Sequence, residues 1–129
     1  MTYNIRNTCA ANIAETEART REALAAEGFG VVMEMDVRQT LIEKTGSDIG
    51  PYKILGACNP GFAKKAIAAE PQIGTLLPCN ILLRDLGDGT TEIAAVDPVA
   101  SMQAVENPAL AEMAGEVRER LERVVTRLR

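Results

Sequence analysis

The 129-residue sequence contains no histidine and no tryptophan, and only 3% of its residues are aromatic. Without histidine, one chain cannot assemble a serine–histidine–aspartate triad or a cysteine–histidine pair, and it offers no imidazole as a metal ligand or as a base near neutral pH. The core must therefore be built from Ala, Leu, Ile, Val and Met. Because such a core is thin, we expect part of the stability to come from a partner subunit.

The sequence also lacks features typical of membrane and nucleic-acid binding. Its net charge is −4, and it has no basic patch with interleaved aromatic residues, so we expect no nucleic-acid partner. No apolar run approaches the ~18 residues of a membrane-spanning helix, and residues 1–6 lack the apolar stretch of a signal peptide. We therefore expect no membrane contact and a cytoplasmic location. The three cysteines, an odd number, argue against a disulfide framework.

The length and the balance of 47% apolar to 25% charged residues are those of one globular domain, and we assign residues 1–129 to a single domain. Hydrophobic periodicity and turn residues divide the chain into strands and helices. The predicted strands are residues 2–6, 29–35, 51–57, 76–86 and 90–96, and the predicted helices are residues 8–27, 36–46, 60–70 and 108–128. This order predicts an α+β fold with a mixed or mostly antiparallel sheet of about five strands, helices packed on one face and a long C-terminal helix.

The last two predicted strands are joined by Asp88-Gly89, a strong signal for a two-residue hairpin turn. Such a turn would place Ile81 opposite Val96. The two-residue period of a strand places Cys79 on the same face as Ile81, and Asn80 on the opposite face.

The predicted C-terminal helix has the clearest amphipathic pattern in the chain. Its apolar residues recur at alternating intervals of four and three, and the opposite side is charged, which is the pattern of a solvated face. We expect the apolar side to pack on the sheet or partly on a second subunit. The apolar residues are Leu110, Ala114, Val117, Leu121, Val124 and Leu128.

Two Cys-Asn pairs, Cys58-Asn59 and Cys79-Asn80, combine reactive side chains with nearby prolines. Asn59 and Pro60 have the residue types of an N-cap and a first helical residue. The unsatisfied N–H groups and positive dipole end of such a helix favour an anion, so they would increase the thiolate fraction of Cys58.

Five short motifs together are typical of one protein family. They are Gly28-Phe29, Leu55–Pro60, Leu76–Asn80, Asp88-Gly89 and Asp97-Pro98. With these motifs the chain resembles, over residues 3–128, the bacterial and archaeal family catalogued as domain of unknown function 302. The resemblance implies a compact α+β domain that tends to be a homodimer, and it implies no settled biochemical activity.

The residues leave several functions open. Cys58 and Cys79 could be buried small residues of a purely structural or interaction module, with Asn59 only capping a helix. Alternatively, the pair could carry a reversible disulfide or persulfide, bind a soft metal such as copper(I) or zinc, or hold a small anionic ligand. An enzyme that uses Cys58 as its nucleophile is less favoured, because no histidine could activate the thiol.

We therefore predict an accessory protein that handles a small ligand, a thiol or a soft metal, and we assign no catalytic residue. The candidate site consists of Cys58, Asn59, Cys79 and Asn80. The spacing of the two cysteines is not that of a metal-binding motif, so the sequence indicates no particular cofactor. The expected macromolecular partner is a second copy of the chain.

Overall fold

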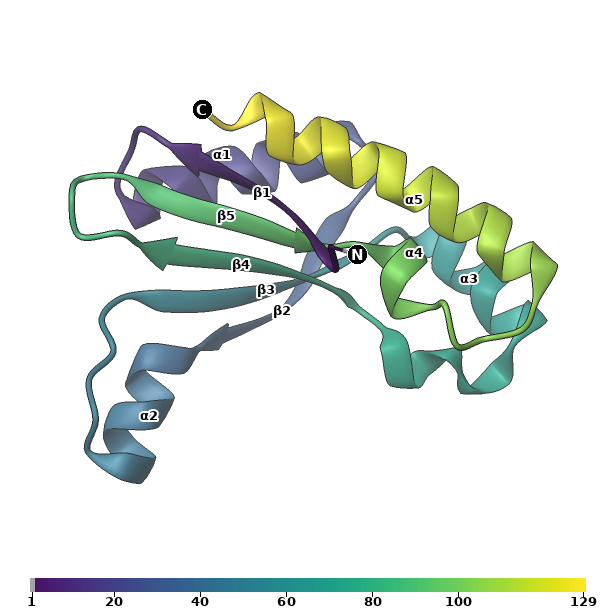
Figure 1. The fold of residues 1–129 in the computed structure, drawn as a ribbon, viewed down its shortest axis with the longest axis horizontal. Coiled ribbons are helices and arrows are strands. Elements are labelled where there is room, and N and C mark those ends of the chain that lie inside the picture. The colour runs from purple at the N-terminus through teal and green to yellow at the C-terminus, as the bar shows by residue number, and fades with distance from the viewer. Residues whose placement is uncertain (1) are drawn as a thin grey trace.

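The computed structural model describes residues 2–129 (Figure 1). Five antiparallel strands form one sheet in the order β1 (Asn4–Cys9), β5 (Thr91–Val96), β4 (Cys79–Asp85), β3 (Tyr52–Cys58) and β2 (Gly30–Asp36). The helices are α1 (Ile13–Ala26), α2 (Val37–Thr45), α3 (Pro60–Ala69), the 3₁₀ helix η1 (Pro71–Leu76), α4 (Pro98–Ser101) and α5 (Pro108–Arg127). The predicted α+β fold and its long C-terminal helix are confirmed. Within residues 2–129, no helix is both long and apolar enough to cross a membrane.

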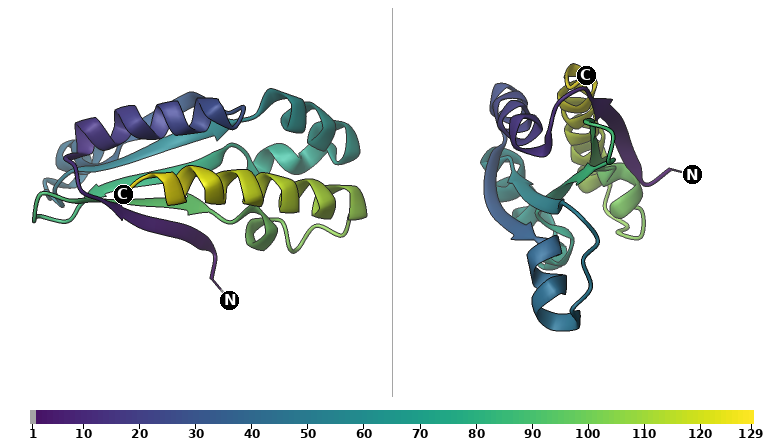
Figure 2. Two further views of the ribbon diagram at one scale, coloured as in Figure 1. Left: turned by 90° about the horizontal axis from the view of Figure 1, so that it is seen from above. Right: turned by 90° about the vertical axis from the view of Figure 1, so that its left-hand side faces the viewer.

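Helices α1 and α5 cover the same face of the sheet (Figure 2). The main core lies between them and the sheet, where Leu24 of α1 and Leu121 of α5 meet Leu55, Ile81 and Ile93. All six apolar residues of the predicted stripe on α5 are buried. Because the stripe packs within the chain, α5 needs no second subunit to cover it.

The C-terminal end of α5 is fixed to the edge strand β1. The Asn7 side-chain amide donates to the backbone carbonyls of Val125 and Leu128, at 3.1 Å and 2.8 Å. Val125 lies in the last turn of α5, where its carbonyl also accepts from the Leu128 amide, and Leu128 is the residue that follows the helix. The bonds from Asn7 therefore hold the helix end at one position along the sheet.

The N-terminal part of the sequence prediction was wrong in its boundaries. The predicted helix over residues 8–27 begins only at Ile13, because Asn12 caps it by accepting a hydrogen bond from the Glu15 amide at 2.8 Å. Cys9 is therefore the last residue of β1 and not part of a helix. It is fully buried, as expected of a free cysteine that packs as a small hydrophobic residue.

The predicted hairpin register was also wrong by one residue. Ile81 lies opposite Ala95, not Val96, because the connection runs from residue 86 to residue 90 and is longer than a two-residue turn. Gly87 and Gly89 both have positive φ (82° and 87°), which permits this wider loop. The shift exchanges the two faces of β5. The predicted faces of β4 are confirmed, since Cys79 is buried and Asn80 is exposed.

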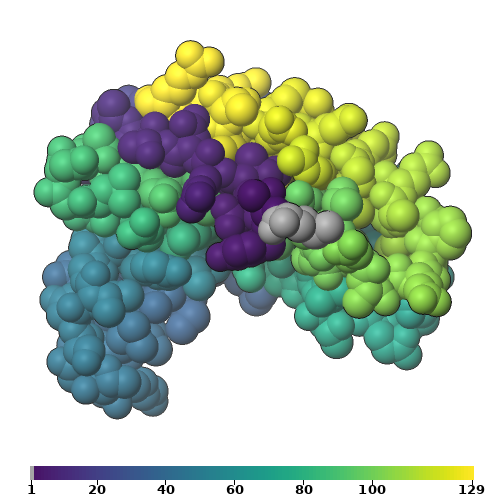
Figure 3. All heavy atoms as spheres, viewed as in Figure 1, coloured from purple at the N-terminus to yellow at the C-terminus, as the bar shows by residue number. Residues whose placement is uncertain are grey.

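The second face of the sheet, which we call the open face, is lined by apolar side chains from four strands. The register places Met35 beside Ile54, Ile54 beside Leu82, and Leu82 beside Ala94. Helix α2 projects from the end of the sheet, and all nine of its residues are half-buried or exposed. The molecule is hollowed on this side, between α2 and η1 (Figure 3).

We expect Gly56→Ala to lower the free energy of unfolding by about 1–3 kcal/mol, the usual cost of overpacking. A Cβ at Gly56 would lie 2.8 Å from Pro78 Cγ and 3.3 Å from Met33 Cβ, and both distances are shorter than an ordinary van der Waals contact. The matched control is Gly30→Ala, where the new Cβ would extend into open space. Urea unfolding followed by circular dichroism measures both variants. Equal unfolding midpoints for the two would contradict the packing argument.

Candidate functional site

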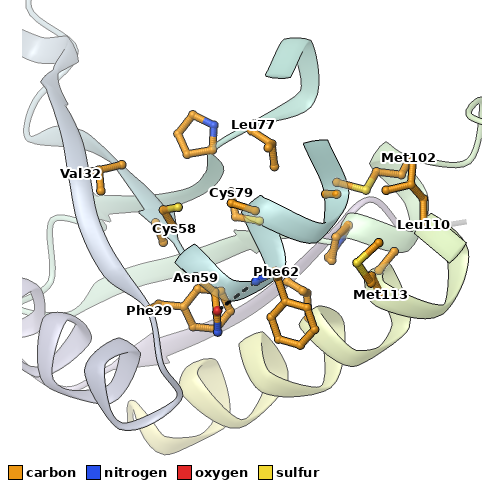
Figure 4. Close-up of a pocket in the computed structure, with 17 residues that line it drawn as sticks. Phe29, Val32, Cys58, Asn59, Phe62, Leu77, Cys79, Met102, Leu110 and Met113 are labelled. Atoms are coloured by element: carbon orange, nitrogen blue, oxygen red, sulfur yellow. Dashed lines mark hydrogen bonds between the residues drawn. The ribbon is translucent and has the colours of Figure 1, made fainter. Parts of the chain in front are cut away.

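An apolar pocket of about 120 Å³, which we call the inner pocket, lies at the ends of β3 and β4 beside α3 and α5 (Figure 4). Its surface consists almost entirely of carbon and sulfur atoms. The larger side chains in its wall are Phe29, Val32, Phe62, Leu77, Met102, Leu110 and Met113. They come from distant parts of the sequence, so the pocket exists only in the folded chain.

The inner pocket lies where two hydrophobic clusters meet without closing on each other. The main core supplies Ala57, Cys79 and Val117, whereas a smaller cluster around Ile73 and Leu110 supplies the other side. Well-packed interiors leave few voids larger than a water molecule. A space of this size between two cores is therefore a distinct feature and not ordinary packing.

The turn from β3 into α3 confirms the predicted helix start. Pro60 is the first residue of α3, and Asn59 Oδ1 accepts a long hydrogen bond of 3.4 Å from the Phe62 amide. Asn59 also packs against Gly28, where an added Cβ would lie 3.0 Å from Asn59 Nδ2. Gly28 has a φ of 84°, which favours glycine. The end of α1 and the start of α3 are thus fitted together beside the pocket.

The structure brings three of the four candidate site residues to the inner pocket. Cys58, Asn59 and Cys79 line it, and the close-up shows both cysteines beside the cavity (Figure 4). Asn80 is exposed on the open face, where it pairs with Gly56, and it does not belong to the pocket wall.

The two cysteines are not paired with each other in the sheet, because Cys79 lies opposite Ala57. Successive side chains in a strand point to opposite faces, so the two thiols approach the pocket from different sides of β3. Both are free thiols. Cys79 is only 7% exposed, whereas Cys58 is half-buried.

Burial raises the pKa of the Cys79 thiol from 9.0 to about 11, and the nearby Cys58 adds to the increase. Cys79 is therefore protonated at neutral pH, which makes it a poor nucleophile. Within residues 2–129, no three side chains of the His, Cys, Asp and Glu types are grouped closely enough to hold a metal ion. The geometry thus gives the thiol-carrier and metal hypotheses no support.

Sequence reasoning missed most of the pocket wall. Phe29 and Phe62 are the only two phenylalanines in the chain, and both line the inner pocket. Two of the five methionines, Met102 and Met113, line it as well. The scarcity of aromatic residues was a usable signal. In a core of small aliphatic residues, the two phenylalanines are the largest apolar side chains, and both are found at one place.

The sequence model of the family described as "Domain of unknown function DUF302" matches residues 5–128. The chain belongs to the DUF302 family. It is also similar to the crystal structure of an uncharacterized conserved DUF302 protein from Bacillus stearothermophilus, with a TM-score of 0.92 and 30% sequence identity over 100% of both chains. Among curated proteins, none matches the chain. Membership in DUF302 confirms the resemblance drawn from the sequence motifs, and it assigns no activity.

We expect iodoacetamide at pH 8 to modify Cys58 and to leave Cys79 largely unmodified. The thiolate is the reactive form, and a pKa of about 11 in place of 9.0 leaves roughly a hundredfold less Cys79 thiolate at this pH. As the pH rises toward 11, modification of Cys79 should increase. Peptide mass mapping distinguishes the sites, and Cys58→Ser should remove the fast reaction. Modification of Cys79 at pH 8 as fast as that of Cys58 would contradict the assigned protonation state.

Proposed function

We propose that the protein binds a small apolar molecule in the inner pocket, with Cys58 and Cys79 contacting it from the pocket wall. The observation that carries this proposal is the pocket itself, about 120 Å³ of space with a surface of carbon and sulfur. Apolar cavities of about 150 Å³ stay dry and bind benzene or xenon. A compact apolar ligand would restore the packing contacts that the wall lacks.

The thiols suit this role better than redox or metal chemistry. Free cysteine in an apolar setting behaves as a small, polarizable hydrophobic residue. The raised pKa of Cys79 keeps its thiol uncharged at neutral pH, so the pocket wall carries no anion there. An apolar ligand could therefore enter without leaving a buried charge unpaired.

Benzene should shift the methyl resonances of Met102 and Met113 in protein labelled with ¹³C at the methionine methyl groups. Met33 and Met35 serve as internal controls, because they lie on β2 and are 57% and 47% exposed. Ala63→Leu, which fills the pocket, should abolish the shifts, whereas Ala94→Leu on the open face should preserve them. Equal shifts of all four methionines, or no shift at Met102 and Met113, would refute binding in the inner pocket.

We also propose that the chain forms a homodimer through the open face. The apolar row from Met35 to Ala94 supports this proposal, because side chains of four strands are half-buried or exposed on that face. The same face carries the ion pair between Arg84 Nε and Glu92 Oε1, 2.7 Å apart. In a two-fold dimer, each copy presents the same surface to the other. The Arg84 of one copy can then lie near the Glu92 of the other, which makes the charges on this face complementary across the interface. A cytoplasmic location stays a prediction from the sequence.

We expect the wild-type protein to have twice the chain mass of 13.8 kDa by sedimentation, and Leu82→Lys to sediment as a monomer. A lysine at the centre of the apolar row would place a charge in the buried middle of the interface. The matched control is Ile67→Lys on α3, where the native side chain is 50% exposed and lies outside the open face. A monomeric wild-type protein, or a dimer that survives Leu82→Lys, would exclude this interface.

A further inference from the structure

A second hollow of about 370 Å³, which we call the outer hollow, lies on the surface between α3 and α5. Its wall is more polar than that of the inner pocket and includes Lys65, Glu112 and Glu116. Two residues, Phe62 and Met113, line both spaces. The inner pocket and the outer hollow are therefore neighbours that share one wall.

The two residues of the shared wall, Phe62 and Met113, differ in how they are restrained. Methionine is unbranched and has three rotatable bonds, so Met113 can change shape at little cost. The Phe62 ring has a cation–π contact with Arg120, whose guanidinium carbon lies 5.3 Å from the ring centroid. Arg120 Nη1 also donates to the Glu27 carbonyl at 2.9 Å, which fixes the guanidinium to the end of α1. Arg120 thus restrains Phe62, one of the two residues of the shared wall.

We infer that the inner pocket and the outer hollow form one continuous site for an elongated amphiphile, an unbranched apolar chain with an uncharged polar end. The apolar chain occupies the inner pocket, passes between Phe62 and Met113, and places its polar end near Lys65 and Glu112. This inference rests on the proposed function and adds to it the class of ligand. A compact apolar ligand would need only the inner pocket and would leave the shared wall unmoved.

A series of straight-chain alcohols from butan-1-ol to decan-1-ol tests this inference in protein with ¹³C-labelled alanine methyl groups. Ala57 and Ala63 report on the inner pocket, and Ala69 and Ala109 report on the outer hollow. We expect affinity to rise about fourfold with each added methylene. We also expect the longer alcohols to shift all four alanines, whereas benzene shifts only Ala57 and Ala63.

The outcomes separate the inference from the proposed function. If benzene leaves Ala57 and Ala63 unshifted, the proposed function fails. If benzene shifts them but decan-1-ol never shifts Ala69 and Ala109, or affinity stops rising once the inner pocket is full, the continuous site is refuted and the proposed function stands.

The restraint of Phe62 by Arg120 has its own test in a matched pair of arginine variants. Arg120→Gln removes the cation beside Phe62, and we expect it to increase the dissociation rate of decan-1-ol about two- to fivefold. Arg123→Gln is the control, because Arg123 Nη2 binds the Glu27 carboxylate at 2.9 Å and lies on the same helix. Both variants lose a contact with Glu27, so equal dissociation rates would refute the role of Arg120 at the wall. Line-shape analysis of Met113 measures the rates.

Discussion

The packing of a long helix on a shorter sheet is the constraint on which the rest of the structure depends. Helix α5 has 20 residues and is about 30 Å long, whereas the seven residues of β4 span about 24 Å. The bonds from Asn7 fix the C-terminal end of the helix, so the excess length lies at its N-terminal end. There α5 extends past the sheet toward α3 (Figure 1), and Leu110 packs with Ile73 and Ala66 of the smaller cluster. The inner pocket lies at this boundary, where α5 stops packing on the sheet and begins to pack on α3 and η1.

This position also determines the chemistry of the cysteines. Cys79 begins β4 beneath the helix layer, where water is excluded and the charged form of a thiol is disfavoured. Cys58 ends β3 and borders the same space from a half-buried position. The offset in register brings the pair to one pocket while their side chains leave β3 and β4 toward different faces. The two sulfurs therefore contribute to the character of the pocket wall without forming a bond to each other.

The features that could be predicted from sequence depend on residues close together in the chain. Asn59 and Pro60 begin a helix because capping needs only the next three residues, and the stripe on α5 follows from the helical repeat alone. The hairpin register failed because two glycines with positive φ permit a loop that competes with the two-residue turn. The pocket wall could not be predicted, because Phe29 and Met113 are brought together only by the docking of α5, a long-range contact that no local pattern encodes.

One close approach connects the pocket to the open face. Pro78 belongs to the wall of the inner pocket, and its Cγ lies where a Cβ at Gly56 would approach to 2.8 Å. On the open face, the same added Cβ would lie 3.3 Å from Met33 Cβ. A side chain at position 56 would push Pro78 toward the pocket, Met33 toward the open face, or both. Gly56, the glycine in the family motif Leu55–Pro60, is thus required by both surfaces at once.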